Sequence, residues 1–226
     1  MKMDNPFKSR VDIVIPVLNE AHVLEKSVGV VREFLKKNLA YPWRIVIVDN
    51  GSTDGTLDVA QTLARNFLDV EFIHLKEKGR GRALREAWRR SPAEVVLYTD
   101  VDLSTELEAL PKLVEALIQE GYDIAIGSRL TKASKTKRCF KREIISRIYN
   151  IFLKSVLFTK FTDAQCGFKA LTREVVDKVI PQVEDQGWFF DTELLVLAEK
   201  QGYRIKDIPV TWVEDDDSRV KIIPTA

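Results

Sequence analysis

Two aspartates, Asp100 and Asp102, follow an apolar run at residues 94–99 and have the spacing that metal chemistry needs. The run has the composition and length of a buried β-strand. Because side chains at i and i+2 of a strand end point the same way, both carboxylates face one point. Ligands bind at this edge of open α/β sheets, and hard oxygen ligands suit Mg2+ or Mn2+ that also holds substrate phosphates. Taken alone, the pair fits a capped, solvated turn equally well.

Acidic side chains also close the first two expected strands. Asp49 ends the apolar run 44–49, where its carboxylate can accept hydrogen bonds from a nucleobase or a ribose. Glu20 follows the first strand and either binds ribose hydroxyls or favours a helix N-terminus. Turn formation and helix capping account for residues 52–54 but not for Asp49.

Strand-like and helix-like segments alternate through the first half of the chain. Strands are expected at residues 11–17, 44–49, 70–75, 94–99 and 122–127, and helices at residues 20–37, 54–66, 81–90 and 107–120. This alternation predicts an α/β fold with a mostly parallel sheet covered by helices on both faces. The segment after residue 129 departs from the alternation, and we expect it to be an addition within one domain of residues 1–226.

Charge is distributed unevenly along the 226 residues. The formal net charge is only +1, but residues 129–160 contain ten Lys or Arg against one acid, Glu143. A basic segment in an otherwise acidic chain implies an anionic partner, and the small net charge gives no reason to expect nucleic acid. Two cysteines and two histidines exclude a disulfide framework and a Cys/His zinc cluster, and they fit a reducing compartment. We recognise no signal peptide and no 18-residue apolar stretch, which predicts a soluble or peripheral protein.

Residues 138–158 have the pattern of a basic amphipathic helix, in which basic residues fall largely outside an apolar stripe. The stripe contains Phe140, Ile144, Ile145, Ile148, Phe152 and Val156, and the basic residues are Lys141, Arg142, Arg147 and Lys154. The pattern is typical of a helix at a membrane interface, but also of a core helix with a solvated basic face. Arg142 and Ser146 lie one turn apart and can bind one phosphate together.

Several motifs, in order along the chain, resemble those of family 2 inverting glycosyltransferases of the GT-A fold. They are IPVLNE at 15–20, VDNGSTDGT at 48–56, KGRGRA at 78–83, DVD at 100–102 and GSR at 127–129. Further motifs resemble the polyprenyl-phosphate (dolichyl-phosphate) glucosyl- and mannosyltransferases. They are TDAQCGFKAL at 162–171, WFFDTELL at 188–195, IPVTW at 208–212 and SRVK at 218–221.

The resemblance implies a role for each matching residue. Asp100 and Asp102 would hold the metal, and Ser104 stands where the family can place a metal-binding Gln. The nucleotide sugar would contact Pro16, Leu18, Glu20, Asp49, Arg80, Asp100, Val101, Asp102, Arg129, Arg219 and Lys221. The acceptor would contact Arg129, Arg142, Ser146 and Gln165. Catalysis would rest on Asp102, Arg129 and Asp191, with Asp191 orienting Arg129 or sugar hydroxyls, or acting as a base toward a hydroxyl acceptor.

Together these roles predict transfer of a hexose from UDP-glucose or GDP-mannose to a polyprenyl or dolichyl phosphate. Mg2+ or Mn2+ would neutralise the leaving diphosphate, while an anionic acceptor phosphate needs positioning more than a base. Residues 1–128 would form the donor half of the domain and residues 129–226 the acceptor half. We expect a peripheral protein on the cytoplasmic face of a membrane, with room for a membrane region beyond residue 226.

Other functions fit part of the sequence. A GT-A enzyme that acts on a soluble sugar or a protein hydroxyl would keep the same fold and donor. A nucleotidyltransferase also uses an acidic metal site, but it usually has a Gly-rich basic loop where this chain has residues 15–20. A non-catalytic membrane-binding module would have no need of the two aspartates.

Overall fold

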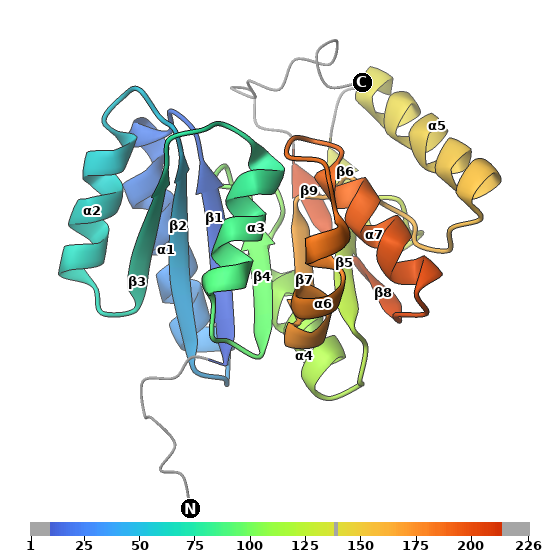
Figure 1. The fold of residues 1–226 in the computed structure, drawn as a ribbon, viewed down its shortest axis with the longest axis horizontal. Coiled ribbons are helices and arrows are strands. Elements are labelled where there is room, and N and C mark those ends of the chain that lie inside the picture. Colours follow the sequence, from blue (N-terminus) through green and yellow to red (C-terminus); the bar gives the residue numbers. More distant parts are fainter. Residues whose placement is uncertain (1–9, 138–139, 214–226) are drawn as a thin grey trace, which may run out of the picture.

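The computed structural model describes residues 10–137 and 140–213, with side chains for all of these except residues 140–143. Its elements follow one another as shown in Figure 1. They are β1 (Val11–Val17), α1 (Ala21–Asn38), β2 (Trp43–Asn50), α2 (Thr56–Asn66), β3 (Val70–Leu75), α3 (Arg80–Arg90), β4 (Val95–Thr99), the 3-10 turn η1 (Leu107–Ala109), α4 (Leu110–Ile118), β5 (Ile124–Ser128), β6 (Lys135–Lys137), α5 (Phe140–Leu157), β7 (Phe168–Thr172), α6 (Arg173–Lys178), the 3-10 turn η2 (Ile180–Gln182), α7 (Phe190–Lys200), β8 (Ile205–Pro209) and β9 (Thr211–Val213).

A seven-stranded sheet in the order β3-β2-β1-β4-β7-β5-β8 forms the centre of the molecule (Figure 1). Its neighbouring strands are parallel except β7, which is antiparallel to both β4 and β5. β6 and β9 form a separate parallel pair. The predicted α/β fold with a mostly parallel sheet is therefore confirmed.

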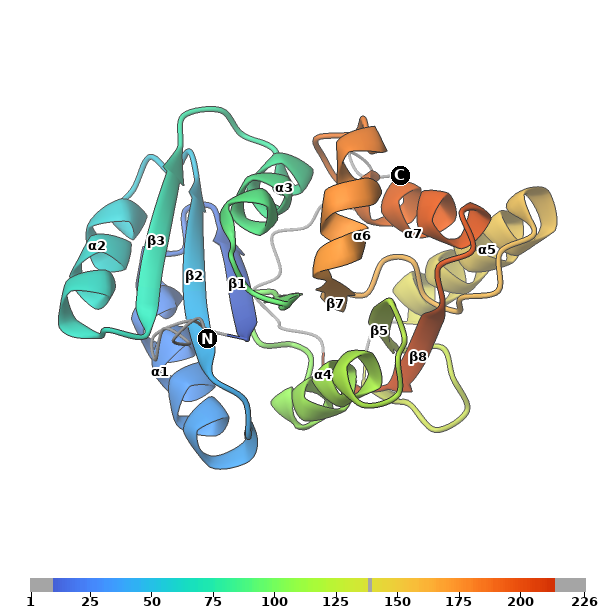
Figure 2. The ribbon, with the colours of Figure 1, turned by 60° about the horizontal axis from the view of Figure 1, so that its bottom comes forward.

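Helices cover both faces of this sheet, as Figure 2 shows. On one face, α1, α2 and α4 bury apolar side chains against the odd-numbered residues of β1, including Ile13 and Ile15. On the other face, α3, α6 and α7 pack around Val14, Val96 and Tyr98. Since side chains of a strand alternate between faces, the continuous apolar runs in the sequence are explained by burial on both sides.

Two expected boundaries differ from the structure for local reasons. The helix expected at residues 107–120 is divided into η1 and α4, and Pro111 lies in the first turn of α4, where its missing N–H costs nothing. α2 begins at Thr56, with Gly55 at the N-cap position, so Asp54 lies one residue before the cap. Its carboxylate still accepts hydrogen bonds from the backbone N–H groups of Thr56 (2.9 Å) and Ala21 (3.4 Å).

Loops at the carboxyl ends of the first three strands are tied together by side chains. Asn19, with a left-handed φ of 58°, donates its backbone N–H to Ser52 Oγ (2.9 Å) and accepts from the Thr53 N–H (2.8 Å). Asn50 accepts from the Gly79 N–H (2.9 Å). These bonds connect the loops that follow β1, β2 and β3, and so fix their positions at the carboxyl end of the sheet.

The antiparallel direction of β7 brings a distant part of the chain to the same edge. Phe168, the first residue of β7, pairs with Thr99, the last residue of β4. Cys166 and Gly167 therefore lie beside Asp100. Burial raises the pKa of the Cys166 thiol to about 12, which agrees with packing and not with a nucleophilic role.

α5 packs beside α7 at the far side of the molecule (Figure 1). The hydroxyls of Tyr149 and Thr192 lie 2.9 Å apart, and Asn150 Oδ1 accepts from the Ala164 N–H (3.0 Å). Within residues 10–137 and 140–213, no helix has the length and apolar character needed to cross a bilayer.

Two glycines let the N-terminus of α3 approach the loop that precedes α7. A β-carbon on Gly79, whose φ is 153°, would lie 2.6 Å from the Gln186 carbonyl oxygen. One on Gly81 would lie 2.6 Å from Cβ of the buried Phe190. The close approach also allows the Gly81 N–H to donate to the Gly187 carbonyl (3.2 Å). Arg80, between the two glycines, is thereby carried into the site.

We expect Gly81→Ala to lower the free energy of unfolding by about 1–3 kcal/mol, because Phe190 and the backbone must move apart. Gly29→Ala is the matched control, since a β-carbon there meets nothing within 4 Å. In the middle of α1 it should stabilise the protein by about 0.5–1 kcal/mol. Urea unfolding of both variants measures the difference, and similar effects at the two positions would contradict the packing argument.

Candidate functional site

Arg80 joins two carboxylates that come from different parts of the chain. Its Nη2 donates to Asp100 Oδ1 (2.6 Å), at the end of β4, and its Nη1 donates to Asp191 Oδ2 (2.6 Å), in the first turn of α7. The guanidinium carbon also lies 5.0 Å from the Tyr98 ring centre and 5.1 Å from that of Trp188. Burial alone would lower the pKa of Arg80, but Asp100 and its other neighbours outweigh burial and raise it. Arg80 is therefore a permanent cation at the centre of the site.

A buried polar cluster of Tyr98 and Lys169 contacts the other carboxylate oxygen of Asp191. Tyr98 Oη donates to Asp191 Oδ1 (2.6 Å), and Lys169 Nζ lies 3.1 Å from the same oxygen. Lys169 is fully buried in β7, opposite Tyr98 in the strand register, and also donates to Tyr98 Oη (3.2 Å). Burial alone would raise the pKa of Asp191, but Lys169 and Arg80 outweigh it and hold the pKa below its usual value. A carboxylate with this pKa and three donors is suited to positioning Arg80 rather than to removing a proton.

One sequence-based assignment is corrected by these contacts. Asp191 was expected to orient either Arg129 or sugar hydroxyls. Arg129 is not its partner, because α7 begins beside α3 and Asp191 contacts Arg80, Tyr98 and Lys169 instead. Glu193, two residues later, accepts from the backbone N–H groups of Glu184 and Asp185 and fixes the loop that precedes α7.

Arg129 is held by Asp163 in a two-pronged ion pair. Its Nε and Nη2 donate to the two carboxylate oxygens (2.8 and 2.9 Å), and its backbone N–H donates to Oδ2 (3.1 Å). Asp163 is fully buried, and although burial alone would raise its pKa, Arg129 outweighs burial and lowers it. A fork geometry of this kind fixes both position and orientation of the guanidinium.

Asp100 and Asp102 offer two carboxylates at the carboxyl end of β4. Asp100 lies against Gly167, where any β-carbon would overlap the carboxylate. Asp102 is exposed, and its Oδ1 accepts from the Ser104 N–H (3.0 Å). Among the described residues, no group of three or more His, Cys, Asp or Glu side chains is arranged to hold a metal. Two hard oxygen ligands fit an ion of the Mg2+ or Mn2+ type that takes its other ligands from phosphate and water.

The expected nucleotide-binding residues lie along the ends of the first two strands. Pro16 is partly buried in β1, Leu18 is exposed after it, and Glu20 forms the N-cap of α1 without a side-chain capping bond. Asp49 is fully buried and accepts from the Ser52 N–H (3.2 Å). Its other oxygen lies 2.7 Å from Nδ1 of His74 on the neighbouring strand β3.

The remaining predicted residues are distributed around this edge. Val101 is buried behind the aspartates, and Gln165 is exposed in the loop that leads to Gly167. Ser146 is buried on α5, and its Oγ has no hydrogen-bond partner among the described residues. Arg219, Lys221 and the side chain of Arg142 lie outside the described part of the chain.

Four residues that build the site were not predicted from the sequence: Tyr98, Asp163, Lys169 and His74. Lys169 carried a signal, because it stands in the otherwise apolar run FKAL of a strand buried on both sides. A charge in such a strand must be paired. Its partner was not visible in the sequence, because Asp191 lies on α7, beyond α6 and η2.

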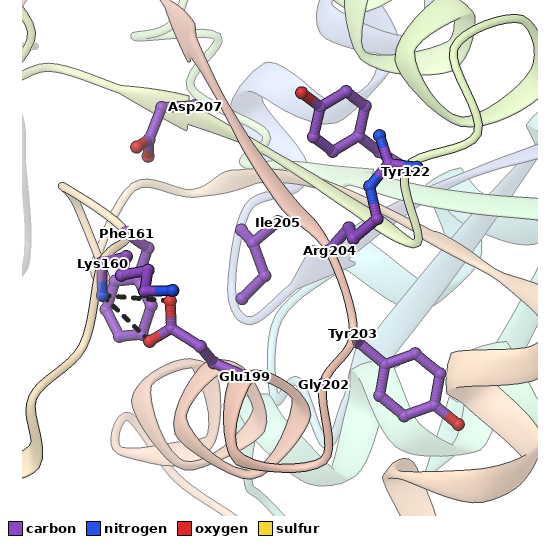
Figure 3. Close-up of a pocket in the computed structure, with 9 residues that line it drawn as sticks. All are labelled: Tyr122, Lys160, Phe161, Glu199, Gly202, Tyr203, Arg204, Ile205 and Asp207. Carbon is purple, nitrogen blue, oxygen red and sulfur yellow. Dashed lines mark hydrogen bonds between the residues drawn. The ribbon is translucent and has the colours of Figure 1, made fainter.

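A hollow of about 400 Å3 lies elsewhere, at the amino ends of β5 and β8 (Figure 3). Tyr122, Tyr203 and Arg204 line it, together with Glu199, which accepts from the Lys160 backbone N–H (3.0 Å). Asp100 lies at the carboxyl end of its strand, at the opposite end of the sheet, so the hollow does not belong to the site described above.

Comparison with known families identifies the family of the chain. Residues 12–180 match the family model described as Glycosyl transferase family 2. The chain belongs to this family. The expectation that the protein is a glycosyltransferase is therefore confirmed.

Curated relatives cover the chain almost completely but are themselves longer. Glycosyltransferase AglD of Haloferax volcanii is 35% identical over 215 residues, which are 94% of this chain and 34% of that protein. Dolichyl-phosphate beta-glucosyltransferase ALG5A of Trichomonas vaginalis is 31% identical over 227 residues, covering 96% of this chain and 70% of the relative. This chain thus spans about a third of the length of the first relative and about seven tenths of the length of the second.

Solved structures share the fold. Glucosyl-3-phosphoglycerate synthase from Mycobacterium tuberculosis, in complex with Mn2+, UDP and glucosyl-3-phosphoglycerate, superposes with a TM-score of 0.68 at 18% identity. The superposition covers 94% of this chain and 73% of that one. The predicted GT-A fold of the glycosyltransferase is confirmed by this likeness.

The two buried aspartates give stability a defined pH dependence. Asp163 and Asp191 have folded-state pKa values below their usual values, so each stabilises the fold above the unfolded pKa of about 4. This stabilisation is lost as the pH falls through the folded pKa. We expect Asp163→Asn to be less stable than the parent protein at neutral pH and to lose less stability on acidification. Urea unfolding between about pH 7 and pH 2 measures both slopes.

Asp58→Asn, on the exposed surface of α2, is the control and should follow the slope of the parent protein. If Asp163→Asn and the parent protein have the same slope, the ion pair with Arg129 does not lower the carboxyl pKa as described.

Proposed function

We propose that this glycosyltransferase moves a hexose from a nucleotide sugar to a polyprenyl phosphate of the dolichyl type. The reaction takes place at the cytoplasmic surface of a membrane and uses a divalent metal ion. The exposed apolar face of α5, attached directly to the helix that carries Asp191, is the observation that carries the proposal. The names of curated relatives such as ALG5A support the choice of acceptor.

α5 turns its apolar stripe away from the protein. Ile148, Ile151 and Phe152 are 61%, 62% and 58% exposed. Ser146 and Asn150, although polar, are on the buried side. Leu153 packs into the core, but the outward apolar side chains support a contact beyond the protein more than they support a helix with only a solvated basic face. An apolar helix face flanked by Lys and Arg suits the interface between headgroups and acyl chains.

The contact between α5 and α7 links such a surface to the site. Tyr149 on α5 meets Thr192, the residue after Asp191. Ser146 lies one turn before Asn150 on the same buried side, and its unpartnered Oγ suits an acceptor phosphate. A lipid phosphate at the membrane surface could therefore reach the site while its lipid chain stays in the membrane.

The donor end uses the residues at the ends of β1, β2 and β4. Asp49 and Glu20 suit the nucleoside, and Asp100 and Asp102 suit a metal-bound diphosphate. When bound, the ion would neutralise charge that develops on the leaving diphosphate. Arg80 bonds to Asp100, and Arg129 is near enough for the charge of Asp100 to act on it, so both supply fixed positive charge. Preorganised charges of this kind stabilise a transition state strongly. A GT-A structure solved with Mn2+ and UDP supports the metal. The names of the beta-glucosyltransferases favour glucose as the sugar that is transferred.

The pKa of Asp191 distinguishes acceptor classes. A hydroxyl acceptor must lose a proton during transfer, whereas a phosphate is already anionic near neutral pH. Since Asp191 is held ionised by Lys169 and Arg80, it is a weak base. The site therefore favours a phosphate acceptor over a soluble sugar or protein hydroxyl.

Donor binding is tested by thermal unfolding with UDP-glucose, GDP-mannose, UDP and GDP, each with and without Mn2+. A ligand at 100-fold over its Kd adds about 2.7 kcal/mol to stability. We expect a shift with one nucleotide class that requires the metal, and Asp100→Asn should abolish this metal-dependent shift. The same variant should lower kcat by about a hundredfold or more. Asp58→Asn should change neither, and a metal-independent shift in the parent protein would contradict the metal site.

Membrane binding is tested with the double variant Ile148→Ser and Phe152→Ser. Losing two large apolar side chains should weaken binding to vesicles by about tenfold to a hundredfold. The free energy of unfolding should change by less than about 0.5 kcal/mol, because both side chains are exposed. The matched control replaces two exposed apolar residues elsewhere, Val30→Ser and Leu68→Ser. Equal vesicle binding by the two double variants would rule out α5 as the membrane contact.

A further inference from the structure

His74 and Asp49 form a pair in which only the histidine is exposed. Nδ1 of His74 lies 2.7 Å from Asp49 Oδ2. The Asp49 side chain is fully buried, whereas 37% of the His74 side chain is exposed. A nucleotide at this end of the sheet therefore meets the imidazole ring before it meets the carboxylate. The donor site described above uses Asp49 and assigns no part to His74.

The strand register puts this pair beside the expected nucleoside. Val17, Asp49 and His74 are directly paired across β1, β2 and β3, and paired residues point to the same face of a sheet. Asp100 follows β4, on the other side of β1 (Figure 1). Three strand spacings separate β3 from β4, which is about 14 Å. A nucleoside diphosphate with its phosphates at Asp100 that extends across β1 and β2 brings its base to His74.

The contact with Asp49 decides which ring nitrogen of His74 carries the proton. An ionised carboxylate only accepts hydrogen bonds, so Nδ1 is the donor and the neutral ring presents Nε2 as an acceptor. Asp49 is itself fixed, because its Oδ1 accepts from the Ser52 N–H (3.2 Å). Within residues 10–137 and 140–213, no hydrogen bond involves Nε2. The pair thus leaves one acceptor of fixed orientation for a ligand.

We propose that Nε2 of His74 accepts a hydrogen bond from the ring N–H of the donor nucleobase, with Asp49 as the positioning residue that fixes the histidine. Uracil and guanine carry such a hydrogen, whereas cytosine and adenine have a lone pair at the equivalent ring nitrogen. An acceptor here selects the first two bases, because two facing lone pairs leave both groups without a partner. The inference rests on the proposed function, which places the nucleoside at the end of β2, and adds the residue that recognises the base.

The experiment measures the affinity of the full chain, with Mn2+, for UDP against CDP and for GDP against ADP. His74→Leu removes both ring nitrogens. His74→Gln places an amide oxygen near the former Nε2, and His74→Asn places an amide N–H near the former Nδ1. We expect the parent protein to favour UDP over CDP, or GDP over ADP, by about tenfold. His74→Gln should keep most of this preference, and His74→Leu and His74→Asn should lose it.

Two controls separate base recognition from folding. His22→Leu replaces the other histidine of the chain, which is exposed on α1, and should leave the preference unchanged. Pyrophosphate has no base, so its affinity in the presence of Mn2+ should be the same in the parent protein and in every variant. A general loss of structure would instead weaken the binding of pyrophosphate and nucleotides together.

Each contrary outcome assigns the fault to one step. If His74→Asn keeps the preference and His74→Gln loses it, His74 only positions Asp49, and the carboxylate meets the base. If His74→Leu weakens UDP and CDP equally, the ring contacts ribose or phosphate and not the base. If His74→Leu keeps the full preference, the inference fails while the donor site of the proposed function stands. If the parent protein binds none of the four nucleotides, that donor site fails as well.

Discussion

The site depends on one cation shared by two acids. Asp100 and Asp191 approach the same guanidinium, and without Arg80 their charges would repel each other. Arg80 reaches them because Gly79 and Gly81 let α3 dock on the loop that precedes α7. These five residues therefore depend on one another. The glycines allow the backbone contact that brings Arg80 to the two acids, and the ion pairs of Arg80 then hold α3 to β4 and α7.

The antiparallel strand β7 makes this arrangement possible. Placed between β4 and β5, it sets Lys169 opposite Tyr98 and brings Gly167 against Asp100. A parallel strand at that position would present its other end to the catalytic edge. A fully buried lysine is stable there because Asp191, the Tyr98 hydroxyl and the Cys166 carbonyl satisfy it, and removing Asp191 would take away the carboxylate that compensates its charge.

α5 has apolar side chains on two sides. Leu153, with Tyr149 and Leu157, packs against the core cluster, and the Asn150 side chain accepts from the Ala164 N–H. A second set of apolar side chains, which includes Ile148, Ile151 and Phe152, faces outward. Through Tyr149, α5 contacts α7 at Thr192, the residue after Asp191.

Local patterns in the sequence determined the elements of the fold. Apolar runs and helical spacing predicted the first five strands and four helices, and Asp100 with Asp102 indicated the site. These signals were readable because they depend on neighbours within a few residues. The ordered motifs identified the family. Pairing between distant residues was decided only by the tertiary structure. Asp191 was expected beside Arg129, yet the direction of β7 and the docking of α3 on α7 give it to Arg80 and leave Arg129 to Asp163. The sequence showed that α5 is amphipathic, but which side is covered depends on what α7 and the 162–164 loop place against it, and no local spacing contains that information.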